Sequence, residues 1–167
     1  MKEPTVQVRT AARADLEAIR EIYNEAILTT TATFDTEPKS AEERLQWFQS
    51  HGERHPILVA VLDGKVVGWA SLNVWSDRHA YDETAETSFY VKSEFRGRGI
   101  GRKLKEATIK EARRLKFHTL VARVAEGSEE SIHLNQSVGF VLVGTMKEVG
   151  CKFGRRLDVH IMQKMLD

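Results

Sequence analysis

Two apolar, β-branched runs separated by only two residues define one structural unit of the chain. Residues 57–62 and 65–74 flank Asp63-Gly64, a dipeptide that strongly favours the type I′ turn of a β-hairpin. An antiparallel strand pair is therefore expected here, with Asp63 and Gly64 at its tip.

Helices and strands alternate through the rest of the chain. Apolar residues recur at helical spacing from Asp15, a candidate N-cap, and Ser40 with Glu43 forms a capping box for a second, short helix. Further strands are expected at 84–92, 119–124, 140–149 and 157–163, and further helices at 99–115 and 128–138. The first of these two helices has an apparent inner stripe at Ile100, Leu104, Ala107, Glu111 and Leu115. This order of elements predicts a single α/β domain over residues 1–167.

Charge and cysteine content exclude several classes of partner. Lys and Arg number 25 against 24 Asp and Glu, so no field favours nucleic acid or an anionic membrane. Cys151 is the single cysteine and forms no internal disulfide, and Gly52 interrupts the metal-ligand spacing of His51 and His55. No apolar run approaches the roughly 20 residues of a membrane span. We expect a cytoplasmic protein that uses no metal.

The segment with the clearest chemical content joins a strand to a helix through three glycines. It runs from Phe89 to Gly101 and ends in Arg96-Gly97-Arg98-Gly99-Ile100-Gly101. Glycines let a backbone approach a ligand closely, and the first amides of the following helix are unpaired donors at the positive end of its dipole. The segment therefore predicts a phosphate or pyrophosphate site, with a glycine turn that merely packs as the alternative. Neither a P-loop nor the dinucleotide fingerprint has this spacing.

Arg96-x-x-Gly99-x-Gly101, between a strand and an amphipathic helix, resembles the acetyl-CoA pyrophosphate loop of the GNAT superfamily of N-acetyltransferases. Within it, four blocks resemble the phosphinothricin and methionine sulfoximine acetyltransferase group: Ile22-Tyr23-Asn24 with 29–38, Arg78-x-Ala-Tyr81, Glu86-x-Ser88-x-Tyr90-Val91, and Val149-Gly-Cys-Lys152-Phe-Gly-x-x-Leu-Asp158. The resemblance covers nearly the whole chain. It implies a GNAT-like fold, with a mixed, mostly antiparallel sheet flanked by helices on both faces, and a homodimer.

The resemblance also implies how the cosubstrate acetyl-CoA is held. The backbone of Phe89, Tyr90 and Val91 is expected to hold the pantetheine like an added strand, with the Val91 N–H stabilising the oxyanion. Other expected contacts come from Arg96, Gly97, Arg98, Gly99, Ile100, Gly101, Arg102, Ser128 and Asn135. Many relatives carry Asn and then Tyr or His at the last two positions. A hydrogen bond from Asn135 to the leaving sulfur and protonation of the thiolate by solvent are both left open.

The resemblance assigns the general base to Glu86, because an α-amino group must lose its proton before it attacks a thioester. Strand alternation places Glu86 on one polar face with Thr84 and Ser88, and a solvent-exposed glutamate is the alternative reading. The expected reaction is acetyl transfer to the α-amino group of a small amino-acid-like substrate such as phosphinothricin or methionine sulfoximine. Alternatives are a protein N-terminus or another amine as acceptor, or a non-catalytic acyl-CoA-binding sensor. The expected substrate contacts are Phe34, Arg78, Tyr81 and Glu86, with Arg78 receiving an acid group.

Overall fold

The computed structural model describes residues 4–166, in which strands and helices alternate largely as expected. The strands are β1 (Gln7–Thr10), β2 (Ile57–Leu62), β3 (Lys65–Val74), β4 (Thr84–Val91), β5 (Thr119–Ala125), β6 (Val141–Lys152) and β7 (Arg155–Met165). The α-helices are α1 (Leu16–Thr29), α2 (Ala41–Ser50), α3 (Ile100–Arg114) and α4 (Glu129–Ser137). Short 3₁₀ turns lie at Arg13–Asp15, His79–Tyr81 and Ser93–Phe95. No helix of residues 4–166 is long and apolar enough to cross a membrane.

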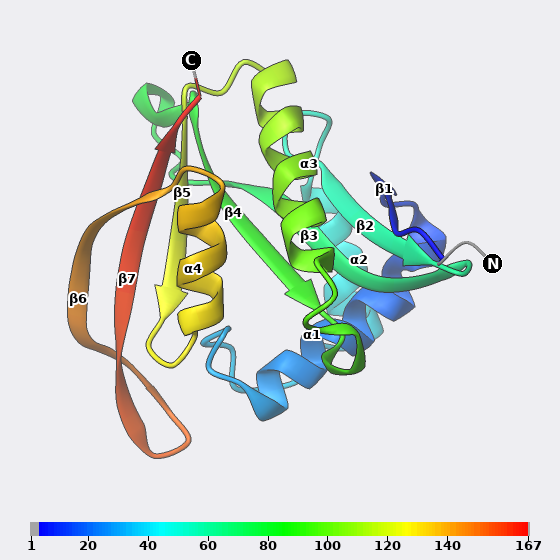
Figure 1. Cartoon of the computed structure of the whole chain (residues 1–167), viewed down its shortest axis with the longest axis horizontal. Helices are drawn as coiled ribbons and strands as arrows, with labels where there is room; N and C mark the ends of the chain where they lie inside the picture. Colours follow the sequence, from blue (N-terminus) through cyan, green and yellow to red (C-terminus); the bar gives the residue numbers. More distant parts are fainter. Residues whose placement is uncertain (1–3, 167) are drawn as a thin grey trace.

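All the described strands join one sheet in the order β1-β2-β3-β4-β5-β7-β6 (Figure 1). Neighbouring strands are antiparallel except β4 and β5, which are parallel. The mixed, mostly antiparallel sheet is thus confirmed. Asp63 and Gly64 both have positive φ, 49° and 75°, as the type I′ turn between β2 and β3 requires.

The parallel pair separates part-way along its length. Thr84, Ala85 and Glu86 lie opposite Thr119, Leu120 and Val121, and the pairing stops there. Beyond Glu86 the second half of β4 has no neighbour on the β5 side. The divergence opens a gap in the middle of the sheet, a feature that no local sequence pattern indicated.

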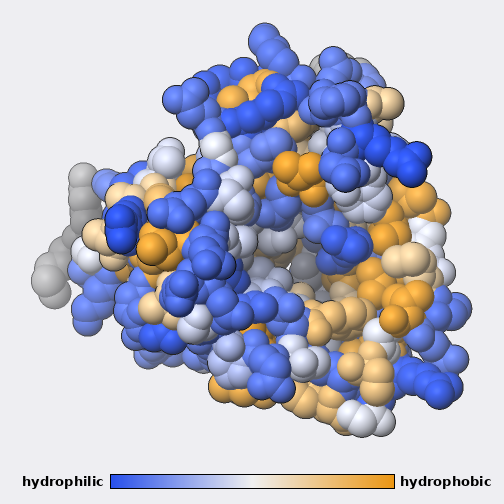
Figure 2. Space-filling model, turned by 180° about the vertical axis from the view of Figure 1, so that it is seen from behind, coloured by the Kyte–Doolittle hydropathy of each residue, from blue (hydrophilic) through white to orange (hydrophobic). Residues whose placement is uncertain are grey.

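The edge strand β6 carries an apolar surface. Figure 2 shows hydrophobic side chains gathered along the right-hand edge of the rear face, the side of the molecule that carries β6. The large apolar residues exposed on this strand are Val141, Leu142, Val143, Met146 and Val149, which we call the β6 patch. Such a patch on an edge strand is a typical site of protein association.

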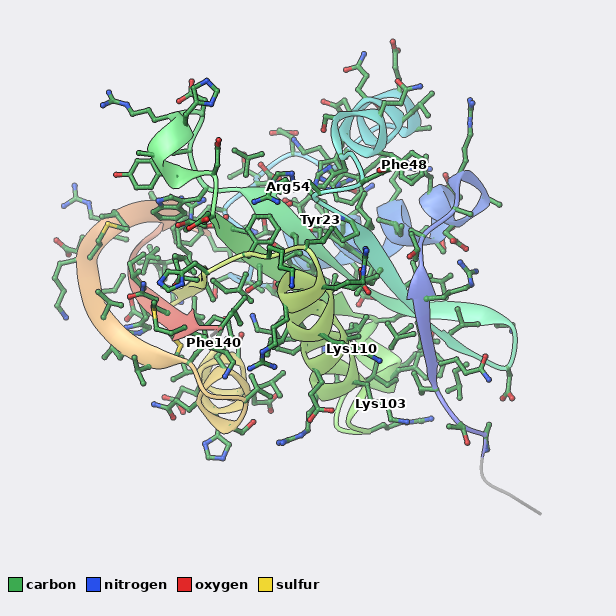
Figure 3. All side chains as sticks on the ribbon, turned by 90° about the horizontal axis from the view of Figure 1, so that it is seen from above. Tyr23, Phe48, Arg54, Lys103, Lys110 and Phe140 are labelled. Atoms are coloured by element: carbon green, nitrogen blue, oxygen red, sulfur yellow. The ribbon has the colours of Figure 1, made fainter. Side chains whose placement is uncertain are left out.

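Helices cover both faces of the sheet, as expected (Figure 3). On one face α1 packs on β2 and β3, with Ile19, Ile22 and Tyr23 against Val59 and Trp69. On the other face Ile100 and Leu104 of α3 pack on Ala60, Val67 and Ala70. A third cluster around Leu120 and Phe140 extends this second layer under α4 and β7. The gap between β4 and β5 therefore lies between two helical layers.

The starts of the first two α-helices were predicted with different success. The capping box is confirmed, since the Ser40 hydroxyl accepts from the Glu43 N–H at 3.1 Å and the Glu43 carboxylate accepts from the Ser40 N–H at 2.7 Å. Asp15 occupies the N-cap position of α1, but its carboxylate binds Arg9 and the Ala12 N–H instead. The strand β1 was missed.

The predicted inner stripe of α3 was partly wrong. Ile100 and Leu104 are buried as expected, but the stripe continues through Lys105, Thr108, Ile109 and Ala112. Glu111 instead pairs with Arg114 at the surface. The helix has thus placed a lysine in its buried face, where apolar periodicity alone gives no reason to expect one.

Candidate active site

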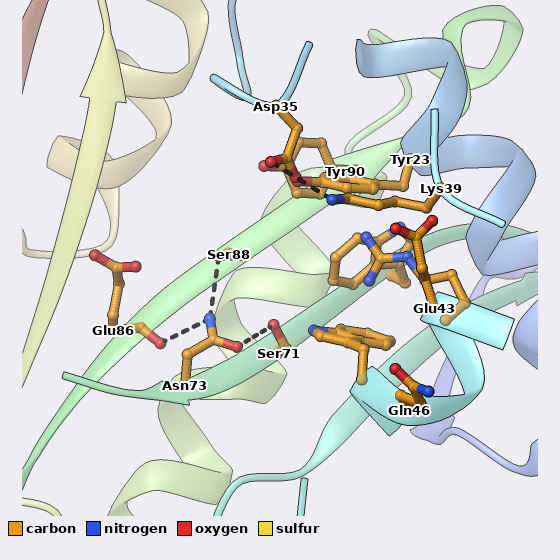
Figure 4. Close-up of a pocket in the computed structure, with 13 residues that line it drawn as sticks. Tyr23, Asp35, Lys39, Glu43, Gln46, Ser71, Asn73, Glu86, Ser88 and Tyr90 are labelled. Atoms are coloured by element: carbon orange, nitrogen blue, oxygen red, sulfur yellow. Dashed lines mark hydrogen bonds and ion pairs between the residues drawn. The ribbon is translucent and has the colours of Figure 1, made fainter. Parts of the chain in front are cut away.

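A cavity of about 480 Å³ lies on the α1–α2 side of the sheet (Figure 4). It is lined from α1, α2, the loop between them, and the strands β3 and β4, by Tyr23, Asp35, Lys39, Glu43, Arg44, Gln46, Trp47, Trp69, Ser71, Asn73, Glu86, Ser88 and Tyr90. We call it the amine cavity. Glu86 and Ser88 both line it, so the predicted polar face of β4 opens into a cavity.

Glu86 is held at one end of the amine cavity by an arginine from the neighbouring strand. Two nitrogens of the Arg123 guanidinium contact its two carboxylate oxygens, one of them at 2.9 Å. The Glu86 side chain is 15% exposed and that of Arg123 55% exposed. A carboxylate oxygen has two lone-pair directions, so this pair leaves Glu86 able to accept a further hydrogen bond.

Asn73 fixes the strands beneath Glu86. Its amide nitrogen donates to the Glu86 carbonyl at 3.3 Å and to the Ser88 hydroxyl at 3.1 Å, and its oxygen accepts from the Ser71 hydroxyl at 3.0 Å (Figure 4). His51 lies 3.0 Å from the same oxygen. This network sets the position of the polar face of β4.

Arg44 lies within the aromatic wall of the amine cavity. Its guanidinium carbon is 4.1 Å from the ring centroid of Tyr23 and 4.3 Å from that of Trp47. The residue is 5% exposed, its Nε has no hydrogen-bond partner, and it forms no ion pair within residues 4–166. Burial lowers the pKa of Arg44 from its ordinary value. A guanidinium fork is well suited to binding a carboxylate or another anion.

The hydroxyl groups of Tyr23 and Tyr90, which line the same cavity, remain neutral. Tyr23 donates to the Asp35 carboxylate, and its oxygen also lies 2.9 Å from the Thr33 hydroxyl. Burial, with the Asp35 hydrogen bond, raises the pKa of Tyr23 to about 12, and burial also raises the pKa of Tyr90. Both tyrosines are therefore protonated near neutral pH and do not serve as proton acceptors.

A second, larger cavity of about 880 Å³ is lined by the glycine loop. Its lining includes Phe89, Tyr90, Val91, Arg96, Gly97, Gly99, Ile100, Gly101, Arg102 and Ser128. Gly99 is the N-cap of α3 with φ of 78°, a conformation that glycine adopts without strain. At Gly101 an added Cβ would lie 3.1 Å from Phe89 and 3.3 Å from Leu134. We call this cavity the cofactor groove, since loop and helix N-terminus together present free amides to it.

The second half of β4 supplies further main-chain groups. Lys92 donates to the Val67 carbonyl at 2.9 Å, which makes these two residues a hydrogen-bonded pair in the β3–β4 register. Such pairs alternate with non-bonded pairs along an antiparallel ladder, so the N–H groups of Val91 and Phe89 point away from β3. Both N–H groups face the gap where β5 no longer pairs with β4. Because the Val91 carbonyl accepts from Arg96 at 3.3 Å, its N–H is the group left for a ligand.

Comparison with known proteins identifies the family to which this geometry belongs. A model of the acetyltransferase (GNAT) domain matches residues 8–161. The chain belongs to the GNAT acetyltransferase family. It is an acetyl-CoA-dependent N-acetyltransferase.

Individual relatives resemble the acetyltransferase over nearly all of its length. The L-amino acid N-acyltransferase MnaT of Escherichia coli is 40% identical, with 97% of this chain and 95% of that protein covered. The L-methionine sulfoximine/L-methionine sulfone acetyltransferase of Salmonella typhimurium is also 40% identical, covering 96% and 94%. The structure of yncA from Salmonella typhimurium with its cofactor acetyl-CoA matches with a TM-score of 0.94 at 39% identity, covering 97% and 94%.

The residues of this acetyltransferase fit acetyl-CoA in two respects. The glycine loop offers unpaired amides where a pyrophosphate requires them, and the gap beside β4 offers the inward Val91 and Phe89 N–H groups to an amide-containing arm. The groove shares Phe89, Tyr90, Ser128 and Ser131 with a small cavity of about 60 Å³, which in turn shares Ser88 and Tyr90 with the amine cavity. The small cavity therefore borders residues that line each of the two large cavities.

Some of the predicted site residues lie apart from these cavities. Arg98 has its guanidinium carbon 5.2 Å from the Phe95 ring centroid and does not line the groove. Arg78 and Tyr81 are exposed around the turn at His79–Tyr81, and Phe34 packs against Gly150. None of the three lines the amine cavity. Asn135 lines the small cavity.

Sequence reasoning missed both partners of Glu86 and the buried Arg44. Arg123 follows from strand alternation only once β5 is known to lie beside β4, and Asn73 only once the β3–β4 register is known. Arg44 stands three residues before Trp47 on α2, where a charged residue reads as part of a solvated face. The only sequence signal for a functional Arg44 was the nearby Trp47, and one aromatic neighbour is weak evidence when the fold is not known.

Proposed function

We propose that this acetyltransferase acetylates the α-amino group of a small L-amino acid that carries a second polar or anionic group, such as methionine sulfoximine or phosphinothricin. The observation that supports this choice is the pairing of charges in the amine cavity: Glu86 lines one part of it, and the buried Arg44 has no carboxylate partner. A zwitterion offers an ammonium to the first and a carboxylate to the second. The names of the relatives agree with this class of substrate.

Glu86 is the proposed general base. The ammonium of the bound amino acid transfers a proton to the Glu86 carboxylate, directly or through one water, and the neutral amine then attacks the thioester. The lone pairs that Arg123 leaves free are the acceptors. The Val91 N–H is the proposed donor to the developing oxyanion, since it faces the gap beside β4.

Arg44 is the proposed receptor for the α-carboxylate, and Arg78 remains the predicted receptor for the second acidic group. The two differ in burial, because Arg44 is buried and lines the amine cavity, while Arg78 is exposed in a loop and does not line it. An exposed guanidinium is suited to a second anionic group that extends beyond the cavity.

The experiment compares L-methionine sulfoximine with the amine obtained by removing its carboxyl group, in the wild type, Arg44→Gln and Arg78→Ala. We expect Arg44→Gln to raise the KM for the amino acid by about 10- to 100-fold and to leave the KM for the decarboxylated amine unchanged, because one charge-assisted interaction is lost. Arg114→Gln, at the far end of α3, is the matched control. Equal effects on both substrates in Arg44→Gln contradict its role, and a carboxylate-specific loss in Arg78→Ala alone moves that role to Arg78.

A homodimer is proposed as the working form of the acetyltransferase. The β6 patch is an edge strand with five exposed large apolar side chains, and a second copy of this chain is the partner that the family resemblance implies. The Lys152 ammonium at the end of β6 donates to the Thr33 carbonyl at 2.8 Å. The β6–β7 hairpin therefore also packs on the loop between α1 and α2, which lines the amine cavity. Association at β6 would thereby stabilise one wall of the site.

A further inference from the structure

Lys105 is a cation inside the protein without an anionic partner. It is 1% exposed, on the inner face of α3. Its ammonium donates to the Thr87 hydroxyl and lies 4.4 Å from the centroid of the Phe140 ring. It forms no ion pair among residues 4–166. An unpaired buried ammonium is costly to the fold, which marks Lys105 as a candidate for a functional role.

The position of Lys105 links it to the reaction. Lys105 and Thr87 line the 60 Å³ cavity that shares lining residues with both the cofactor groove and the amine cavity. We expect an acetyl group that moves from a thioester in the groove to an amine in the amine cavity to pass this small cavity. The breaking carbon–sulfur bond is therefore expected beside Lys105.

We propose that Lys105 protonates the sulfur of CoA as it leaves. The amine nitrogen forms a bond to the acetyl carbon, the carbon–sulfur bond breaks, and its electron pair passes to sulfur. The Lys105 ammonium supplies the proton that converts this thiolate to the thiol. The amine loses one proton before the attack and a second as the amide forms. Both pass in turn through Glu86 to solvent, and Lys105 regains one from solvent after the products leave, so one proton is released per turnover.

The surroundings of Lys105 suit a proton donor. Burial lowers its pKa to about 7, while the charge of Glu86 opposes this shift. An ammonium with that pKa is a stronger acid than a thiol, whose ordinary pKa is about 8.5, so proton transfer to the thiolate is downhill. Arg123 of β5 is the other charged residue that lines the small cavity, and it pairs with Glu86. The lining residues from α4 and its N-cap are uncharged, namely Ser128, Ser131 and Asn135.

Asn135 is a weaker candidate for the same task. Its amide nitrogen already donates to the Ser131 carbonyl at 2.8 Å, and its buried oxygen has no partner. The free atom of Asn135 is thus an acceptor, suited to an N–H of the pantetheine arm. An amide is in any case too weak an acid to protonate a thiolate.

The first test measures binding and requires no turnover. Affinities for CoA and for desulfo-CoA, which lacks the sulfur, are compared by calorimetry at pH 6, where Lys105 is protonated, in the wild type and in Lys105→Met. A Lys105–sulfur interaction predicts that the wild type prefers CoA by about threefold or more and that Lys105→Met binds both alike. Lys110→Met is the matched control, since Lys110 is exposed on the same helix (Figure 3).

The second test measures the chemical step by single turnover with any amine that the wild type acetylates. Lys105→Met is expected to lower the rate by about 10²-fold with little change in acetyl-CoA affinity, and to remove the alkaline limb of the pH–rate profile. Lys105→Gln serves as a second neutral variant if the first folds poorly.

An unchanged rate in either neutral variant, or an equal loss of affinity for CoA and desulfo-CoA, overturns the assignment. The inference rests on the proposed placement of the cofactor but not on the amino-acid substrate. Wild-type activity on simple amines alone would contradict the proposed substrate and leave this test intact.

Discussion

At the scale of single residues, alternation along β4 predicted which face carries Glu86 but not which residues bind it. The pattern Thr84, Glu86, Ser88 predicted one polar face, and the structure places Glu86 and Ser88 at one cavity. The partners of Glu86 depend on the strand register and could not be read from the sequence: Arg123 is 37 residues away along the chain, and Asn73 is 13 residues away. The predicted substrate residues Arg78, Tyr81 and Phe34 rest on the family resemblance alone, because none of them lines the amine cavity.

Replacing Glu86 tests the proposed base. Glu86→Gln is expected to lower kcat by roughly 10²- to 10⁴-fold, because the positioned proton acceptor is lost while the shape of the side chain is kept. Acetyl-CoA affinity, measured by calorimetry, should remain that of the wild type. Wild-type kcat at pH 7 in this variant would remove Glu86 from the mechanism.

The burial of Lys105 also predicts how the free energy of unfolding depends on pH. Its pKa is about 7 in the folded protein against an ordinary value of 10.5, so unfolding takes up a proton between these two pH values. The destabilisation from the buried charge is therefore complete below pH 7 and disappears as the pH rises to about 10.5. Lys105→Met should be more stable than the wild type by about 1 to 4 kcal/mol at pH 6 and nearly equal to it above pH 10. Urea unfolding at the two pH values checks this, and a variant less stable at pH 6 would contradict it.

At the scale of elements, short sequence patterns predicted the features that depend on neighbouring residues. They missed the features that depend on pairing between strands far apart in the chain. The Asp63-Gly64 hairpin, the Ser40–Glu43 capping box and the glycine loop are each defined by neighbouring residues, and all three were predicted correctly. The four-residue edge strand β1 is mostly exposed, so it carries no apolar alternation to reveal it. The gap beside β4 results from the end of pairing with β5, which no short segment specifies.

The glycine loop predicts two distinct defects. Gly99→Ala places a side chain at φ of 78° with open space around it, so we expect weaker CoA binding through a strained loop in a stable protein. Gly101→Val instead meets Phe89 and Leu134, so it should lower thermal stability as well as CoA affinity. Calorimetry and thermal unfolding separate the two, and normal CoA affinity in folded Gly99→Ala would show that the loop is only structural.

At the scale of the whole molecule, the β6 patch predicts association. Val143→Glu introduces a charge into the patch, and its side chain is 60% exposed in the single chain, so the fold should tolerate the change. Sedimentation is expected to show a dimer for the wild type and a monomer for Val143→Glu. Lys65→Glu, exposed at the start of β3, is the control. A wild-type monomer would contradict the dimer.

The most direct test of the proposed function is the steady-state release of CoA thiol by the wild type with L-methionine sulfoximine, with its decarboxylated amine, and with a short peptide that has a free N-terminus. The charges of the amine cavity predict that kcat/KM for the amino acid exceeds both others by about 10- to 100-fold, because only this substrate carries its ammonium and a carboxylate on the same carbon, for Glu86 and Arg44. Equal or higher kcat/KM for the decarboxylated amine or the peptide would contradict amino-acid N-acetylation as the activity of this site.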